Sequence, residues 1–175
     1  MGQPYVVYER ESMMAEYWDL YDGTGHKTGE KHLRGTAVPE GRFHKVVHIW
    51  IRNSRGELLM QKRSDMVDNC PGEWATTGGS VQEGEEPLTT AVRELEEELG
   101  LTVSVEELQY CLMVRRPSAY CYVYVLRKDV PTENLTLQEC EVAAVEWMSL
   151  EKIDRMVDDR TMHRYVYREM LESYL

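Results

Sequence analysis

Three glutamates on one predicted helix face are the residues whose types and spacing most clearly indicate chemistry. Glu94, Glu97 and Glu98 stand at positions i, i+3 and i+4, so they are neighbours on the surface of an α-helix. Three negative charges within a few ångströms repel one another unless a cation lies between them. Carboxylate oxygens are the ligands that hard divalent cations prefer, so the pattern predicts a site for Mg²⁺ or Mn²⁺.

The helix that carries these glutamates is predicted to pack on a core through its opposite side. Pro87 suits the first helical turn, where a missing N–H is not needed, and Gly100 suits the C-terminal cap. Glu96 is expected to point away from the acidic face into solvent. The apolar stripe consists of Leu88, Val92, Leu95 and Leu99.

The spacing around this helix resembles the Nudix box. Gly79 is followed after five residues by Glu85, and after seven more by a run that begins at Arg93 and ends at Leu101. A solvated acidic helix would explain a glutamate-rich composition but not these fixed intervals. The defined positions of the box are filled by Gly79, Glu85, Arg93, Glu94, Leu95, Glu97, Glu98, Gly100 and Leu101.

This resemblance implies an α+β fold in which a mixed β-sheet is sandwiched between α-helices. It also implies hydrolysis of a diphosphate that is linked to another group, with a small-molecule diphosphate as the substrate. The metal ligands it implies are the carboxylates of Glu94, Glu97 and Glu98, together with the carbonyl oxygen of Gly79. Glu97 and Glu98 are therefore expected to be catalytic.

Supporting roles and the general base follow from the same resemblance. Arg93 is counted with the catalytic residues because it is expected to hold the carboxylates by salt bridges, and Glu85 is expected to hold the loop against the helix. Glu141 is the candidate general base because it precedes a later apolar segment that contains a tryptophan. Glu139 and Glu98 stay open as alternatives for the base.

The region from Phe43 to Trp74 is similar to the isopentenyl-diphosphate isomerase side of the superfamily. Isomerases of that kind carry a cysteine just before the box glycine and a histidine just after it, where this chain has Gly78 and Ser80. The isomerase chemistry is therefore disfavoured. A nucleotide-sensing module without catalysis is the other alternative, and the complete glutamate set argues against it.

Hydrophobic alternation and turn residues predict one domain with three parts. Residues 1–35 are expected to form an N-terminal extension with a β-hairpin, residues 36–150 the Nudix core, and residues 151–175 a C-terminal helical segment. The expected strands span residues 17–21, 43–52, 57–62, 74–77, 110–115, 120–127 and 142–148.

The formal net charge of −11 argues against nucleic acid or anionic membrane as a partner, because both attract basic surfaces. The four cysteines have no C-x-x-C spacing, and no apolar run approaches the length of a membrane span, so a cytoplasmic protein with reduced thiols is expected. A homodimer is kept as an open alternative to a monomer.

Substrate phosphates must then be bound by a few basic side chains, and a base or other ring by aromatic ones. The basic candidates at strand ends are Arg52, Lys62, Arg63, Arg115 and Arg116. The stacking candidates are Trp18, Tyr110, Tyr120 and Tyr122, for which core packing is the competing role.

Overall fold

The computed structural model describes residues 15–175 of the chain, and residues 1–14 of the expected N-terminal extension lie outside the described part. A β-hairpin comes first, with β1 at Tyr17–Tyr21 and β2 at Lys27–Leu33. The two strands are antiparallel and form a sheet of their own. A hairpin is what the sequence predicts for this part of the chain.

The central sheet has seven strands and is mixed. Strands β3 and β8 pair in parallel along their whole length, whereas every other pairing in the sheet is antiparallel. The strands are β3 His44–Arg52, β4 Leu58–Arg63, β5 Trp74–Ala75, β6 Thr77–Ser80, β7 Leu108–Arg115, β8 Ala119–Arg127 and β9 Val142–Met148.

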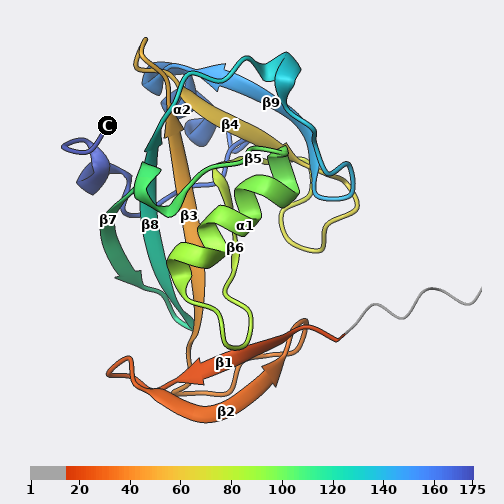
Figure 1. The fold of residues 1–175 in the computed structure, drawn as a ribbon, viewed down its shortest axis with the longest axis vertical. Helices are drawn as coiled ribbons and strands as arrows, with labels where there is room; N and C mark the ends of the chain where they lie inside the picture. Colours follow the sequence, from red (N-terminus) through yellow and green to blue (C-terminus); the bar gives the residue numbers. More distant parts are fainter. Residues whose placement is uncertain (1–14) are drawn as a thin grey trace, which may run out of the picture.

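Two helices cover the two faces of this sheet (Figure 1). Helix α1, Pro87–Leu99, packs on one face and α2, Leu150–Asp158, on the other. Three short 3-10 turns lie at Val105–Glu107, Thr132–Asn134 and Arg168–Leu171. The expectation of an α+β fold with a mixed sheet between helices is confirmed.

Alternation along the central strands explains why both faces are apolar. In β3, Ile49 and Ile51 point toward α1, whereas Trp50 points toward α2 and the C-terminal segment. Each of these three side chains is fully buried. Leu95 and Leu99 of α1 are also fully buried, so the predicted apolar stripe does anchor the acidic helix to the sheet.

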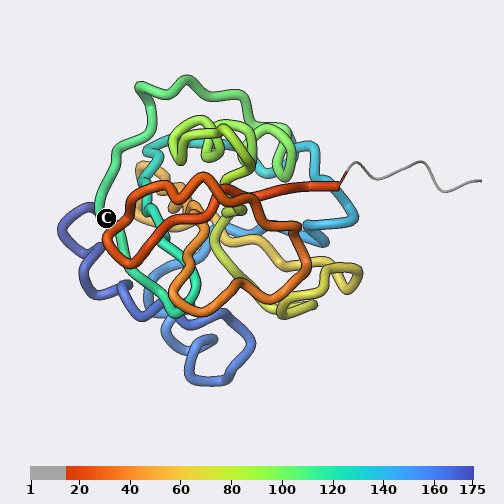
Figure 2. The backbone as a smooth tube through the Cα atoms, turned by 90° about the horizontal axis from the view of Figure 1, so that it is seen from below, coloured from red at the N-terminus to blue at the C-terminus, as the bar shows by residue number. Residues whose placement is uncertain are grey.

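The N-terminal hairpin crosses one end of the molecule, with α1 to one side and the C-terminal segment to the other (Figure 2). It is tied to the loop before α1, since the N–H of Gly84 donates to Asp19 at 2.8 Å and the N–H of Glu83 donates to the carbonyl of Tyr17 at 2.8 Å. The hairpin therefore holds the loop that precedes the acidic helix.

The C-terminal segment is helical over only part of its length. Helix α2 ends at Asp158, and Arg160 has a positive φ of 58° that cannot continue a right-handed helix. The following residues run as extended chain beside β5, where Met162 forms an isolated parallel bridge with Trp74. The expectation of a helical segment over residues 151–175 is thus wrong for residues 159–167.

Among residues 15–175, no helix combines the length and the apolar character needed to cross a membrane.

Candidate active site

The loop and helix predicted from the glutamate spacing form one compact unit. Strand β6 delivers Gly79, and α1 begins at Pro87 after the loop. Gly100 ends the helix in the left-handed conformation at φ 63°, and a Cβ there would lie 2.8 Å from Cβ of Thr136. Glycine is therefore the residue that lets the chain turn away so abruptly after the last glutamate.

Arg93 links the glutamates of this unit. Its Nε donates to Glu85 at 3.0 Å, and its Nη1 donates to both Glu94 and Glu97 at 2.9 Å. Glu85 also accepts from the hydroxyl of Thr90 at 2.8 Å. These contacts match the supporting geometry expected for Arg93 and Glu85.

Glu98 lies deeper than the other box glutamates, with 5% of its surface exposed. Its carboxylate accepts from Nε2 of Gln61 at 2.9 Å, and Gln61 in turn accepts from the hydroxyl of Thr77 at 2.9 Å. Burial, followed by the charge of Glu94, raises the pKa of Glu98 to about 8. Burial likewise raises the pKa of Glu94 to about 7, against the lowering effect of Arg93.

The backbone at Gly79 and the carboxylate of Glu94 share one small space. A Cβ at position 79 would lie 2.1 Å from Oε1 of Glu94, so only a glycine leaves room for this approach. Backbone and carboxylate oxygens are the donors of a hard-cation site, and the raised pKa values of the buried Glu98 and the half-buried Glu94 favour a positive partner. The residues present therefore fit a divalent cation at this position.

The box carboxylates do not yet converge on one point. Within residues 15–175, the three-residue group whose ligand atoms all lie within 4.8 Å of one another is a different one, Cys70, Glu73 and His163. Glu94 and Glu97 are instead paired with Arg93, and Glu98 is bonded to Gln61. A cation at the box would have to draw at least one carboxylate away from these partners.

A cleft of about 810 Å³ runs beside this unit and is lined by the residues predicted as metal ligands, by Arg93 and by the first candidate for the general base. Glu141 enters it from the turn before β9, whereas Glu139 and the exposed Glu96 do not line it. The predicted residues it brings together are Gly79, Arg93, Glu94, Glu97, Glu98 and Glu141.

Besides Arg93, three arginines line the cleft, and two of them were predicted from the sequence. Arg63 and Arg116 were candidates, whereas Arg34 comes from the N-terminal hairpin and pairs with Glu16 at 2.5 Å. The other basic candidates, Arg52, Lys62 and Arg115, are not part of the lining. No local signal marks Arg34, because its place depends on how the hairpin docks.

The expected aromatic stacking residues do not line the cleft. Trp18 stacks on the ring of His44 at 4.0 Å, and Tyr120 donates its hydroxyl to the carbonyl of Asp22 at 2.8 Å. The aromatic ring that does line the cleft is that of Tyr165, whose hydroxyl accepts from the N–H of Thr76 at 2.8 Å. Trp18 and Tyr120 are absent from the lining because both side chains make contacts within or against the packed hairpin.

Two histidines, the buried His44 and the half-buried His48, also line the same cleft. Burial lowers the pKa of His44 to about 4 and that of His48 to about 3, so both rings are neutral at physiological pH. Nδ1 of His44 is buried and has no hydrogen-bond partner among the described residues. Sequence reasoning did not assign either ring to the site.

Gly78 gives a physical reason to set the isomerase chemistry aside. A Cβ at this position would lie 2.3 Å from the carbonyl oxygen of Val47 on β3. That contact is with backbone, so no side chain fits here unless the strands move apart. The cleft therefore has no place for a thiol at the position where isomerases carry one.

Comparisons with known proteins agree with this geometry. A family model described as the NUDIX domain matches residues 42–172. An uncharacterised Nudix hydrolase of Listeria innocua is 34% identical over 142 residues, covering 81% of this chain and 84% of that protein. Nudix hydrolase 3 of Arabidopsis thaliana is 33% identical over 154 residues, covering 80% of this chain and 20% of the plant protein.

The fold is also similar to that of a solved structure. DR0079 from Deinococcus radiodurans superimposes with a TM-score of 0.75 and 24% sequence identity. The match covers 91% of this chain and 100% of that chain. At this identity the likeness concerns the fold alone.

Proposed function

Because this chain belongs to the Nudix hydrolase family, we propose that its cleft hydrolyses the diphosphate bond of a small organic diphosphate, with Mg²⁺ or Mn²⁺ as the cofactor. A nucleoside diphosphate linked to another group is the substrate class we favour. The observation that supports this most directly is the meeting of the box acids, Glu141 and three arginines around one cleft.

The residues that would hold the cation are Glu94, Glu97 and Glu98, with the carbonyl oxygen of Gly79. When bound, the cation supplies positive charge beside the phosphates and makes a nearby water more acidic. Glu98 is fixed in direction by Gln61, and Glu94 is fixed by Arg93 and by the close backbone of Gly79. These contacts set the present directions of the two carboxylates, and a bound cation would replace at least one of these partners.

Glu141 is the residue we assign to proton removal from the attacking water. Its turn is tied to the end of α1, since the N–H of Gln138 donates to the carbonyl of Glu98 at 3.1 Å. The N–H of Glu141 donates to Gln138 at 2.8 Å, and its carbonyl accepts from Ser64 at 2.9 Å. The carboxylate is thereby placed at the cleft from a different element than the metal ligands.

Arg34, Arg63 and Arg116 are the cationic side chains that we assign to the substrate phosphates. They line the cleft from three elements, the N-terminal hairpin, the end of β4 and the β7–β8 turn. Guanidinium groups bind phosphate oxygens in pairs, so three of them can hold a diphosphate from several sides. They also offset the negative charge that the glutamates give to the cleft.

The test is turnover of a panel of nucleoside diphosphate-linked compounds and simple organic diphosphates with Mg²⁺, Mn²⁺ or a chelator. We expect at least one compound to be split at its diphosphate bond, and the chelator to stop the reaction. Binding without turnover across the panel would instead identify a nucleotide-sensing module. Undiminished turnover in the chelator would rule out the cation assigned to the box.

A further inference from the structure

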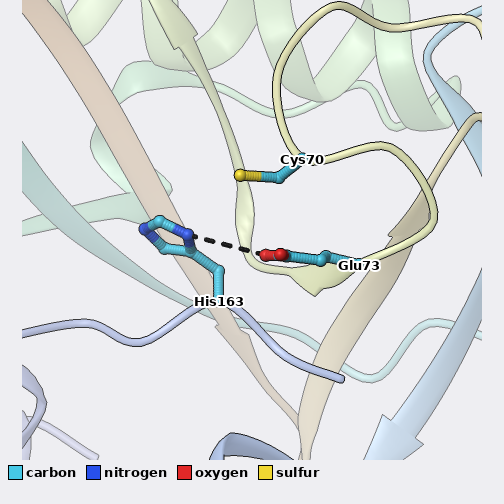
Figure 3. A group of neighbouring side chains, drawn as sticks. All are labelled: Cys70, Glu73 and His163. Carbon is cyan, nitrogen blue, oxygen red and sulfur yellow. Dashed lines mark ion pairs between the residues drawn. The ribbon is translucent and has the colours of Figure 1, made fainter. Parts of the chain in front are cut away.

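A cysteine, a glutamate and a histidine converge outside the box glutamates (Figure 3). Cys70 and Glu73 come from the loop between β4 and β5, and His163 comes from the extended chain after α2. One ligand atom from each lies within 4.8 Å of the other two, and Nδ1 of His163 is 3.9 Å from the Glu73 carboxylate. Residues ninety positions apart in sequence thus present three different donors to one point.

The backbone holds these two segments together at the point of contact. The N–H of Trp74 donates to the carbonyl of Thr161 at 3.0 Å, and the N–H of His163 donates to the carbonyl of Trp74 at 2.8 Å. The N–H of Glu73 donates to the carbonyl of Cys70 at 3.3 Å. Main-chain hydrogen bonds therefore hold together the two backbone segments that carry the three side chains.

Cys70 is also held in an unusual backbone conformation. Its φ of 49° lies in the left-handed region, which residues with a Cβ rarely adopt. The thiol is exposed, whereas Glu73 and His163 are half-buried. Solvent can thus reach the thiol, and the other two donors are shielded on one side.

The donor set selects a class of ion. A thiolate, an imidazole and a carboxylate suit Zn²⁺, whereas Mg²⁺ and Mn²⁺ prefer oxygen alone. Zinc bonds of about 2.0–2.3 Å in a tetrahedron place neighbouring ligand atoms roughly 3.3–3.8 Å apart, so the present spacing needs only a small contraction. Burial lowers the pKa of His163 and so favours the neutral ring, which has a lone pair for a metal.

We propose that Cys70, Glu73 and His163 form a binding site for a thiophilic divalent cation, Zn²⁺ or a close relative, separate from the box glutamates. All three residues line a second hollow of about 540 Å³, and Cys70 and His163 also line the main cleft. The ion ties the β4–β5 loop to the chain after α2 along one rim of the cleft. A fourth coordination position stays open to water or to an anion.

The first experiment uses Co²⁺ as a spectroscopic substitute for zinc, added to reduced protein in saturating Mg²⁺. We expect a thiolate-to-cobalt charge-transfer band in the near ultraviolet, removed by Zn²⁺ in one-to-one proportion. Cys70→Ser should abolish the band, and the matched Cys140→Ser should keep it, because Cys140 is also exposed but lies outside the group. A band that persists in Cys70→Ser, or no band in the wild type, overturns the proposal.

A second experiment separates this site from the box and does not depend on activity. His163→Gln should weaken zinc binding by more than the roughly 10–100-fold that loss of an outer partner causes. Glu94→Gln/Glu98→Gln should leave it unchanged. Zinc should also slow alkylation of Cys70 and spare that of Cys140 in the same wild-type sample. Equal protection of both thiols, or loss of zinc binding in the box double variant, contradicts the assignment.

Discussion

Arg93 is the residue on which the other box residues depend for their positions. It contacts Glu85, Glu94 and Glu97 at once, so one guanidinium fixes the loop and two carboxylates. Desolvation acts against the charged form, but these acids outweigh it and raise the pKa of Arg93 beyond its ordinary value. Arg93 therefore stays charged at any pH at which the protein is folded.

Glu97 is the box glutamate whose role can be tested against a neighbouring glutamate outside the cleft. Glu97→Gln should lower kcat by several orders of magnitude, because it removes an anionic ligand while keeping the shape of the side chain. Glu96→Gln changes the exposed neighbour outside the cleft and should leave kcat unchanged. Steady-state kinetics at saturating Mg²⁺ compares the two, and equal rates would remove Glu97 from the metal ligands.

Glu141 and Glu139 form a similar pair for the general base. Glu141→Gln should lower kcat by about 10²–10⁴-fold and flatten the acidic limb of the pH–rate profile, since the base would be lost. Glu139→Gln should behave as wild type because that side chain does not line the cleft. If the acidic limb survives in Glu141→Gln, the base must be sought at Glu98.

The raised pKa values of Glu94 and Glu98 predict how stability changes with pH. An acid whose pKa is about 7 or 8 when folded and near 4.5 when unfolded binds its proton more tightly in the folded state. Its contribution is therefore fully present below pH 4.5 and is lost as pH rises through about 8. Metal-free protein should melt at a progressively lower temperature between pH 5 and pH 8.

Two controls accompany this melting experiment. Glu94→Gln/Glu98→Gln should flatten the decline, because glutamine does not titrate. Mg²⁺ should raise the wild-type melting temperature most at the alkaline end of this range, where the acids are ionised. At 100 times its dissociation constant, the cation should add about 2.7 kcal/mol to the free energy of unfolding. The same Mg²⁺ effect in the double variant would mean that the cation binds elsewhere.

At the scale of elements, two neighbouring glycines let β6 lie close to two partners, since Gly79 approaches α1 and Gly78 approaches β3. A Cβ at position 79 would meet the end of a flexible side chain, that of Glu94, whereas a Cβ at position 78 would meet the backbone of Val47. The Glu94 side chain can rotate away from an added Cβ, whereas the Val47 carbonyl cannot move without the strand. The two positions therefore have different expected costs.

Gly79→Ala should reduce Mg²⁺ affinity and kcat while changing the melting temperature little, since Glu94 is displaced but the strand is kept. Gly78→Ala should lower the melting temperature by at least about 3 °C, the shift that roughly 1 kcal/mol produces in a domain of this size. Calorimetry and metal titration of both variants separate the effects. A large loss of stability in Gly79→Ala would contradict the local role given to it.

Most elements could be predicted from the sequence because their signals are local. The helix at Pro87–Leu99 and the strands around Tyr120 follow from periodicity, proline and glycine. The extended chain at 159–167 could not, because its path depends on a bridge to Trp74 far earlier in the sequence. The pairing of β6 with β3 beyond the two residue pairs that β4 makes could not be predicted either, because it joins segments that are far apart in the sequence.

At the scale of the whole molecule, part of the cleft lining comes from segments outside the Nudix box. The hairpin supplies Arg34 and Glu16, and the chain after α2 supplies His163 and Tyr165. None of these has a sequence signal that points to the site, because each reaches it only through long-range packing. The box acids were predictable since a single helix brings them together.

Arg34 tests whether the hairpin takes part in substrate binding. Arg34→Ala should raise KM by roughly 10-fold, which corresponds to about 1.4 kcal/mol, because it removes one charged donor to the phosphates. Arg42→Ala is the matched control, since Arg42 pairs with Glu30 of the same hairpin but does not line the cleft. Similar KM values for the two variants would exclude Arg34 from the binding surface.

The parallel pairing of β3 with β8 affects how the protein folds while the ribosome is still synthesising it. Strand β3 is complete once Arg52 has been synthesised, but its parallel partner β8 is complete only at Arg127. Strand β4 likewise pairs with β9, which is complete only at Met148. The early strands therefore leave the exit tunnel with apolar faces that have no partner until most of the chain has been translated. Nascent chains halted before β8 should need chaperone protection, and those released after His163 should not.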